Sequence, residues 1–181
     1  LKEFVTENGV MEEHDLAVVG YEIARALRHF QERRMVHGDI KPGNVMLSDD
    51  GEVKLLDFGL TRTLSEAEIL QVDEVITTPA YSAPEAMLLD GVIDISSDVY
   101  CLGGSLYFGA TGVPPYPGDT CDEVLRLRDV YEPTPVDELN PNITPVFADL
   151  ISSMLSEAKE ERPSVEDVIG HLAAFLPAEA L

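Results

Sequence analysis

The sequence of 181 residues has no tryptophan, only two cysteines and no long hydrophobic run. Cys101 and Cys121 form no CxxC motif, so neither a zinc site nor a disulfide framework is indicated, which is typical of a reducing cytoplasm. No apolar run approaches the roughly 20 residues of a membrane-spanning helix, and no cleavable signal is present. We therefore expect a cytoplasmic segment with no membrane contact of its own, although an anchor elsewhere in the protein would be compatible with this.

Basic residues are also scarce. The 12 Lys and Arg are outnumbered by 34 Asp and Glu, and the formal net charge is −22. The acidic residues are spread along the chain rather than gathered in one tail. Such a surface repels the phosphates of nucleic acids and of anionic membranes, so we expect no nucleic-acid partner.

The length of 181 residues is that of one domain-sized unit, and hydrophobic periodicity and capping residues predict several helices along it. The clearest pattern runs from Glu12 to Arg34, where apolar residues recur at spacings of three and four, as in a long amphipathic helix. These residues are Leu16, Val19, Ile23, Leu27 and Phe30.

A second, largely buried helix is predicted to end at Gly112, with Ser96 or Ser97 as its cap and Cys101 as a buried structural thiol. Residues 133–141 are predicted to form a loop. Capping residues predict the remaining helix starts, which lie at Asp119 or Thr120, at Thr144-Pro145 and at the Ser164-x-x-Asp167 box.

Residues 45–56 predict a β-hairpin that turns at Asp50-Gly51. Asn44 and Asp57 flank its two open ends, so folding the hairpin places them on neighbouring strands about 5 Å apart. An amide oxygen and a carboxylate then converge where a hard cation can bind. Magnesium is the natural candidate.

Asp39 and Lys41 lie two residues apart in an extended segment interrupted by Pro42, so both side chains point to the same side. A carboxylate in this position can orient or deprotonate a hydroxyl, while the ammonium stabilises charge on a transferred phosphoryl group. Together with a cation at the hairpin, this pattern predicts phosphoryl transfer.

Three ordered elements resemble a eukaryotic-type (Hanks-type) Ser/Thr protein kinase: His37-Gly38-Asp39-Ile40-Lys41-Pro42-Gly43-Asn44, Asp57-Phe58-Gly59 and Ala83-Pro84-Glu85. The resemblance covers essentially the whole chain. It implies an α+β, mainly α-helical fold, namely a kinase-like C-terminal lobe over residues 1–181 with a small β-hairpin at the catalytic cleft. The sequence has no Gly-rich loop, third-strand Lys or partner Glu of the N-terminal lobe, so we expect this N-lobe to be a missing partner and the segment alone to be inactive.

The resemblance also implies roles for individual positions. Asp39 is the implied catalytic base, Lys41, Asn44 and Asp57 are the other phosphoryl-transfer residues, and Asn44 and Asp57 bind Mg²⁺. ATP is the implied second cofactor, bound by Lys41, Asn44, Asp57 and Met46. Met46 is interpreted both as plain strand core and, by resemblance, as part of the floor under the adenine. The Asp-x-Lys pattern implies a protein substrate with a Ser or Thr hydroxyl.

Four further positions are interpreted as structural by the resemblance. His37 could act as a general base or a metal ligand, but the resemblance favours stacking on Phe58, next to Gly59, which fixes the loop. Asp98 could be no more than an acid favoured by the helix dipole. The resemblance instead implies that its carboxylate holds the backbone of the catalytic loop.

The end of the activation segment resembles the substrate-docking loop of the family. It contains Thr78, Pro79 and Tyr81, and Thr78 matches the Thr whose hydroxyl reaches the catalytic Asp and Lys. Glu85 and Arg162 match the pair that ties the end of this segment to the helical base.

Gly38 departs from the family pattern, because activation-dependent kinases usually have Arg there to receive a phosphorylated residue. We therefore expect activity that does not depend on phosphorylation of the loop. Two other functions compete with this interpretation. A pseudokinase that scaffolds partners would fit if the N-lobe lacked its Lys, whereas a kinase of small molecules is disfavoured by the docking segment 78–85.

Overall fold

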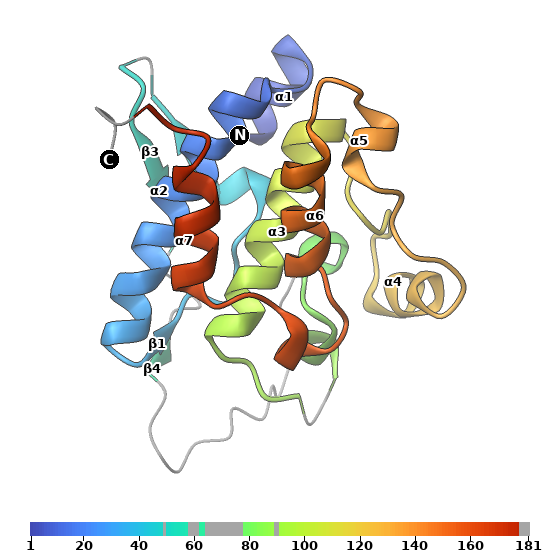
Figure 1. Ribbon diagram of the computed structural model, residues 1–181. Helices are drawn as coiled ribbons and strands as arrows, with labels where there is room; N and C mark the ends of the chain where they lie inside the picture. Colours follow the sequence, from blue (N-terminus) through green and yellow to red (C-terminus); the bar gives the residue numbers. More distant parts are fainter. Residues whose placement is uncertain (49, 58–61, 64–77, 89–90, 178–181) are drawn as a thin grey trace.

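The computed structural model describes residues 1–48, 50–57, 62–63, 78–88 and 91–177 (Figure 1). The α-helices in these ranges are α1 (Lys2–Asn8), α2 (Glu13–Glu32), α3 (Ile95–Thr111), α4 (Cys121–Arg128), α5 (Val136–Leu139), α6 (Pro145–Met154) and α7 (Val165–Ala173). The short strands are β1 (Met35–Val36), β2 (Val45–Leu47), β3 (Val53–Leu55) and β4 (Arg62–Thr63). Short 3₁₀ turns are η1 (Pro42–Asn44), η3 (Pro79–Tyr81), η4 (Pro84–Met87) and η5 (Lys159–Glu161).

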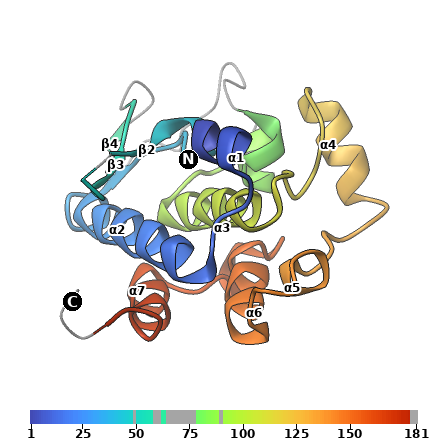
Figure 2. The same cartoon turned by 90° about the horizontal axis from the view of Figure 1, so that it is seen from above.

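The two longest helices, α2 and α3, lie side by side, with α3 near the centre of the molecule (Figure 2). Helices α6 and α7 cover one side of this pair, while α1 and the β2–β3 hairpin lie on the other. The mainly helical fold with a small hairpin is therefore confirmed. The loop that leads into the hairpin lies on the side away from α6 and α7, which is where the candidate site forms.

Helix α2 buries the apolar face that its spacing predicts. Leu16 and Leu27 have no exposed surface and Ile23 has 1%. Gly20 lies on the same face, where a Cβ atom would come within 2.9 Å of a methyl group of Leu172 in α7 and 3.1 Å of one in α3. Glycine is therefore what allows the three helices to approach this closely.

Helix α3 is buried along nearly its whole length and contains the buried thiol of Cys101. Its start differs from the prediction, because the cap is Asp94 rather than Ser96 or Ser97. The Asp94 carboxylate accepts a hydrogen bond from Ser96 N at 2.9 Å, and Ser97 Oγ accepts one from Asp94 N at 3.2 Å. The carboxylate thus takes the capping position, and the serine completes a reciprocal box. Gly112 ends the helix at φ 77°, as predicted.

The other predicted helix starts are confirmed, since Thr120, Thr144 and Ser164 cap α4, α6 and α7. The loop predicted over 133–141 is wrong in part, because α5 lies within it. This helix has four residues and one buried side chain, Val136, which is too short to produce a helical period in the sequence.

The predicted hairpin is present. Strands β2 and β3 pair antiparallel, with Val45 opposite Leu55 and Leu47 opposite Val53, and Gly51 N donates to Ser48 O at 2.9 Å in the turn. Strands β1 and β4 form a second antiparallel ladder. None of the described helices is both long and apolar enough to span a membrane.

Candidate active site

The loop that follows β1 is held by the first turn of α3. Asp98, which has no exposed surface, accepts hydrogen bonds from His37 N at 2.8 Å and from Gly38 N at 2.9 Å. Burial raises the pKa of Asp98 to about 7, and these two N–H donors act in the opposite direction. The predicted contact between Asp98 and the loop backbone is therefore present. Asp98 is more than an acid favoured by the dipole of α3.

The His37 ring is fully buried, and its Nδ1 accepts a hydrogen bond from Asp39 N at 3.3 Å. Burial lowers the pKa of His37, so the ring is neutral near pH 7. The ring also packs against Phe30 at a centroid distance of 5.7 Å. A buried, neutral ring whose nitrogen supports the loop backbone fits the structural interpretation better than a general base. The predicted stacking partner Phe58, with Gly59, lies outside the described residues.

Asp39, Lys41 and Asn44 form one hydrogen-bonded group. Lys41 Nζ donates to Asp39 Oδ2 at 2.7 Å, and Asn44 Nδ2 donates to the same oxygen at 2.9 Å and to the Asp39 carbonyl at 2.8 Å. The side chain of Asp39 is only 10% exposed. Ile40, between the two charged residues, is buried at 2% exposure and anchors the loop. The prediction that both charged side chains share one side is confirmed.

Asp57 is brought to this group by the hairpin. Leu56 N donates to Asn44 O at 2.7 Å, which fixes the residue before Asp57 against the residue before β2. Asp57 is exposed and has φ 64°, a left-handed conformation that costs a non-glycine residue roughly 1–2 kcal/mol. Such a conformation persists only where the surrounding contacts impose it, and it marks many functional sites.

The donor set of Asn44 and Asp57 fits a hard cation. The Asn44 amide nitrogen is held by Asp39, so the amide oxygen is the atom left for a metal, and the Asp57 carboxylate is exposed. Within the described ranges no group of three His, Cys, Asp or Glu is arranged to bind a metal ion. Two oxygen ligands from the protein nevertheless suit Mg²⁺, which is usually bound by one or two carboxylates together with waters and substrate phosphates.

The second part of the site is a pocket of about 630 Å³ beside the η3 turn. One wall is formed by residues 78–81 and the other by Pro114 and residues 117–119 with Glu123. Tyr81 supports the first wall, because its ring packs edge-on against Phe108 at 6.1 Å, and burial raises its pKa to about 12.

Thr78 begins this wall, and its predicted contact with Asp39 and Lys41 stays a prediction. In the described part of the chain, Asp39 and Lys41 bond to each other and neither bonds to Thr78. The Thr78 carbonyl instead accepts hydrogen bonds from Tyr81 N at 3.1 Å and from Ser82 Oγ at 3.0 Å. Its backbone is therefore fixed within its own turn.

Glu85 and Arg162, 77 positions apart, form the predicted bidentate pair. Arg162 donates to the two Glu85 carboxylate oxygens at 2.7 and 2.9 Å. The Arg162 side chain has no exposed surface, and that of Glu85 is 14% exposed. Burial acts to raise the pKa of Glu85, but hydrogen bonds from Arg162 and Ser97 outweigh it and hold this pKa below its ordinary value.

Comparison with known proteins shows which family the chain belongs to. A family model for the protein kinase domain matches residues 1–172. The chain belongs to the protein kinase family. It is 39% identical over 154 residues to the DNA damage-responsive serine/threonine-protein kinase RqkA of Deinococcus radiodurans, a match covering 84% of this chain and 23% of that protein. It is 32% identical over 162 residues to the serine/threonine-protein kinase PknL of Mycobacterium tuberculosis, covering 90% of this chain and 40% of that kinase. The chain therefore spans less than half the length of these two relatives.

In this kinase domain, Met46 borders a cavity of about 820 Å³ that is lined by parts of residues 1–8 and by the loop and hairpin. Met46 is 37% exposed, whereas its neighbour Val45 is 2% exposed and belongs to the core. The core interpretation therefore holds for Val45 and not for Met46, as the period of a strand requires, and the adenine contact of Met46 stays a prediction.

Sequence reasoning gave no role to Arg128 of α4 in this kinase domain. An arginine in the last turn of a helix is ordinarily an exposed partner of the helix dipole. Here its side chain is only 5% exposed and it donates to the backbone of the segment around Tyr81. The sequence contains one signal. Arg128 comes two residues after Arg126, and the helical period puts residues two apart on different sides of α4.

Proposed function

We propose that the protein is an active Ser/Thr protein kinase that transfers the γ-phosphoryl group of ATP to a Ser or Thr hydroxyl of a protein substrate. Residues 1–181 form the C-terminal lobe of its catalytic domain. One observation carries this proposal: the Asp39 carboxylate is fixed by Lys41 and Asn44, on a loop whose backbone is held by Asp98.

The geometry at Asp39 supports its role as the base. Lys41 and Asn44 both donate to Oδ2, and within the described residues no group donates to Oδ1. Oδ1 is therefore the oxygen that accepts the proton of the substrate hydroxyl as the hydroxyl attacks phosphorus. The Lys41 ammonium orients the Asp39 carboxylate and stabilises the charge that develops on the transferred phosphoryl group.

The side chains and cavities of the structure suit Mg²⁺, ATP and the protein substrate at three different places. Asn44 and Asp57 would hold Mg²⁺, and the cavity beside Met46 would receive the adenine. Bound Mg²⁺ and ATP supply the phosphoryl group and neutralise its charge. The pocket formed by residues 78–81 and 117–119 would receive the protein substrate near its hydroxyl residue.

The proposal of a C-terminal lobe rests on what a kinase needs to grip the phosphates. A Gly-rich loop and a strand Lys do this in the family, and neither pattern occurs in residues 1–181. The matched segment covers 23% and 40% of the two relatives, so a protein of their length would have room for an N-lobe. That N-lobe is the first partner we assign to this chain.

The test is phosphoryl transfer by the complete protein, with labelled ATP and a peptide library containing Ser or Thr. The Asp39→Asn variant should lower kcat by about 10²–10⁴-fold, because the amide cannot take the proton. Its control is Asp149→Asn, an equal change of charge at an exposed position of α6, which should leave kcat unchanged. Transfer that persists in Asp39→Asn would refute the assignment, and a wild-type protein that binds ATP without transfer would be a pseudokinase.

A further inference from the structure

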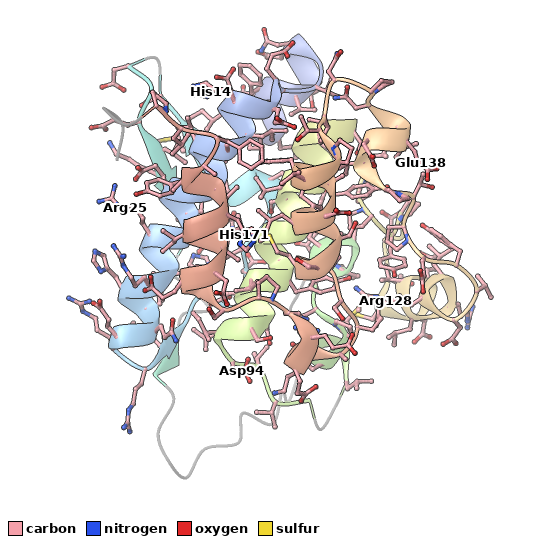
Figure 3. The ribbon with its side chains drawn as sticks, in the orientation of Figure 1. His14, Arg25, Asp94, Arg128, Glu138 and His171 are labelled. Atoms are coloured by element: carbon pink, nitrogen blue, oxygen red, sulfur yellow. The ribbon has the colours of Figure 1, made fainter. Side chains whose placement is uncertain are left out.

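Arg128 comes from the last turn of α4 and lies on the side of that helix facing the helical body (Figure 3). One of its terminal nitrogens donates to the Ser82 carbonyl at 2.8 Å, and the other donates to Glu157 Oε1 at 2.7 Å. The planar guanidinium can do this because its fork presents N–H groups in two directions at once. Three separate parts of the chain therefore meet at this one side chain.

Two aromatic rings enclose the same guanidinium. Its carbon lies 4.4 Å from the centre of the Tyr116 ring and 5.0 Å from that of Tyr100. The Tyr100 ring is shared, because the Arg162 guanidinium lies 4.9 Å from its centre. Ring faces attract cations, and the attraction is stronger where water is excluded. Arg128 and Arg162 are therefore held in place by one buried ring.

Each of these arginines grips a different point of the substrate-docking segment. Arg162 holds its end through the Glu85 carboxylate, while Arg128 holds Ser82 through the backbone. Ser82 passes this restraint on, because its Oγ donates to the Thr78 carbonyl at 3.0 Å. The contact with Arg128 thus reaches the first residue of the pocket wall.

The position of α4 explains what the contact controls. The substrate pocket has residues 78–81 on one wall and residues 117–119 with Glu123 on the other. The second wall leads directly into α4, and Arg128 in α4 bonds to Ser82, the residue that follows the first wall. Through this bond Arg128 connects the two elements that carry the walls and restrains their separation.

The geometry points to Arg128 as a positioning residue that keeps the substrate-docking pocket open at a fixed width for the protein substrate. This inference rests on the proposed kinase function. Arg128 touches neither the Asp39 group nor Asn44 and Asp57 in the described structure, so its effect falls on the protein substrate and not on ATP.

The test uses the complete kinase and compares Arg128→Gln with Arg126→Gln. Arg126 is an exposed arginine of the same helix, so the control has the same change of charge. For Arg128→Gln we expect the KM for a peptide substrate to rise about tenfold or more, with the KM for ATP within about twofold of wild type. Arg126→Gln should change neither constant. A merely structural loss would instead lower the folded fraction and affect both substrates alike.

Hydrogen exchange gives a readout that needs no activity. The amides of Tyr81 and Ser82 are bonded within the η3 turn, and in Arg128→Gln they should exchange at least about tenfold faster than in Arg126→Gln. Arg128→Lys keeps the charge but loses the fork, so it should show most of the same effect even if the glutamine variant does not fold. Equal exchange and equal peptide KM in the Arg128 and Arg126 variants would overturn the inference. A wild-type protein without kinase activity would refute the proposed function, while the exchange comparison would still decide the role of Arg128.

Discussion

Removing either partner of the Glu85–Arg162 pair should destabilise the protein far more than its surface ion pairs do. Arg162 makes more than the bidentate contact, since its Nε donates to the Ser156 carbonyl at 2.8 Å and a terminal nitrogen reaches the Ser96 carbonyl at 3.2 Å. Glu85 in turn accepts from Ser97 Oγ at 2.6 Å. Each side chain thus makes hydrogen bonds to several partners in a site that is almost closed to water.

The burial of both side chains determines the magnitude. Arg162→Ala leaves a carboxylate that is 14% exposed without its cation, and Glu85→Gln leaves a fully buried guanidinium without its anion. Each change should cost about 3–5 kcal/mol of unfolding free energy, with Glu85→Gln near the lower end because its amide oxygen still accepts one bond. In the double variant neither charge is stranded, so it should be about 2 kcal/mol more stable than the sum of the single changes predicts.

The assay is a double-mutant cycle by urea unfolding of the intact protein. Arg25 and Glu22 supply the control pair, because they lie 3.1 Å apart on the surface of α2 with side chains 47% and 36% exposed. Their coupling should be below about 0.5 kcal/mol. If the effects at Glu85 and Arg162 add within about 0.5 kcal/mol, the argument from burial is wrong.

Three more outcomes follow from the site. Residues 1–181 alone, once shown by circular dichroism to be folded, should bind Mg²⁺ and ATP poorly and transfer no phosphate, and micromolar affinity by calorimetry together with turnover would contradict this. Phosphatase treatment of the complete kinase should change its rate by less than about twofold, because Gly38, at φ 79°, supplies no guanidinium to a phosphorylated loop; a tenfold loss would show that another basic residue receives the phosphate. The lowered pKa of Glu85 means that its contribution to stability is present at neutral pH and is lost as pH falls below about 4.5, so the difference between wild type and Glu85→Gln should shrink between pH 5 and pH 3 in urea titrations.

Local rules predicted the elements that depend on neighbouring residues. The spacing of Leu16, Ile23 and Leu27 predicted the buried face of α2, and Asp50-Gly51 predicted the hairpin turn. Both follow from periods and turn preferences that act over a few residues. The contacts of Asp98 and Arg162 join distant positions, and only the resemblance to kinases could indicate them.

Local rules did not resolve choices between competing partners. Asp94 and Ser96 are both good caps, and the Asp94 carboxylate that takes the position also pairs at 2.8 Å with Lys159, from a distant part of the chain. The role of Arg128 depends in the same way on two tyrosines and a carbonyl that only the folded chain brings together. No spacing within α4 encodes these partners.

These distant contacts converge on the first two turns of α3. Asp98 holds the proposed catalytic loop, and Tyr100 supports the arginines that hold the proposed docking segment. Ser97 Oγ accepts from the Asp94 backbone in the capping box and donates to Glu85, so one hydroxyl joins the start of the helix to the end of the activation segment. The proposed catalytic loop and the proposed docking pocket are therefore positioned by the same buried helix end. Because α3 is buried along nearly its whole length, the separation of these two parts of the site is set by the core of the protein rather than by its surface loops.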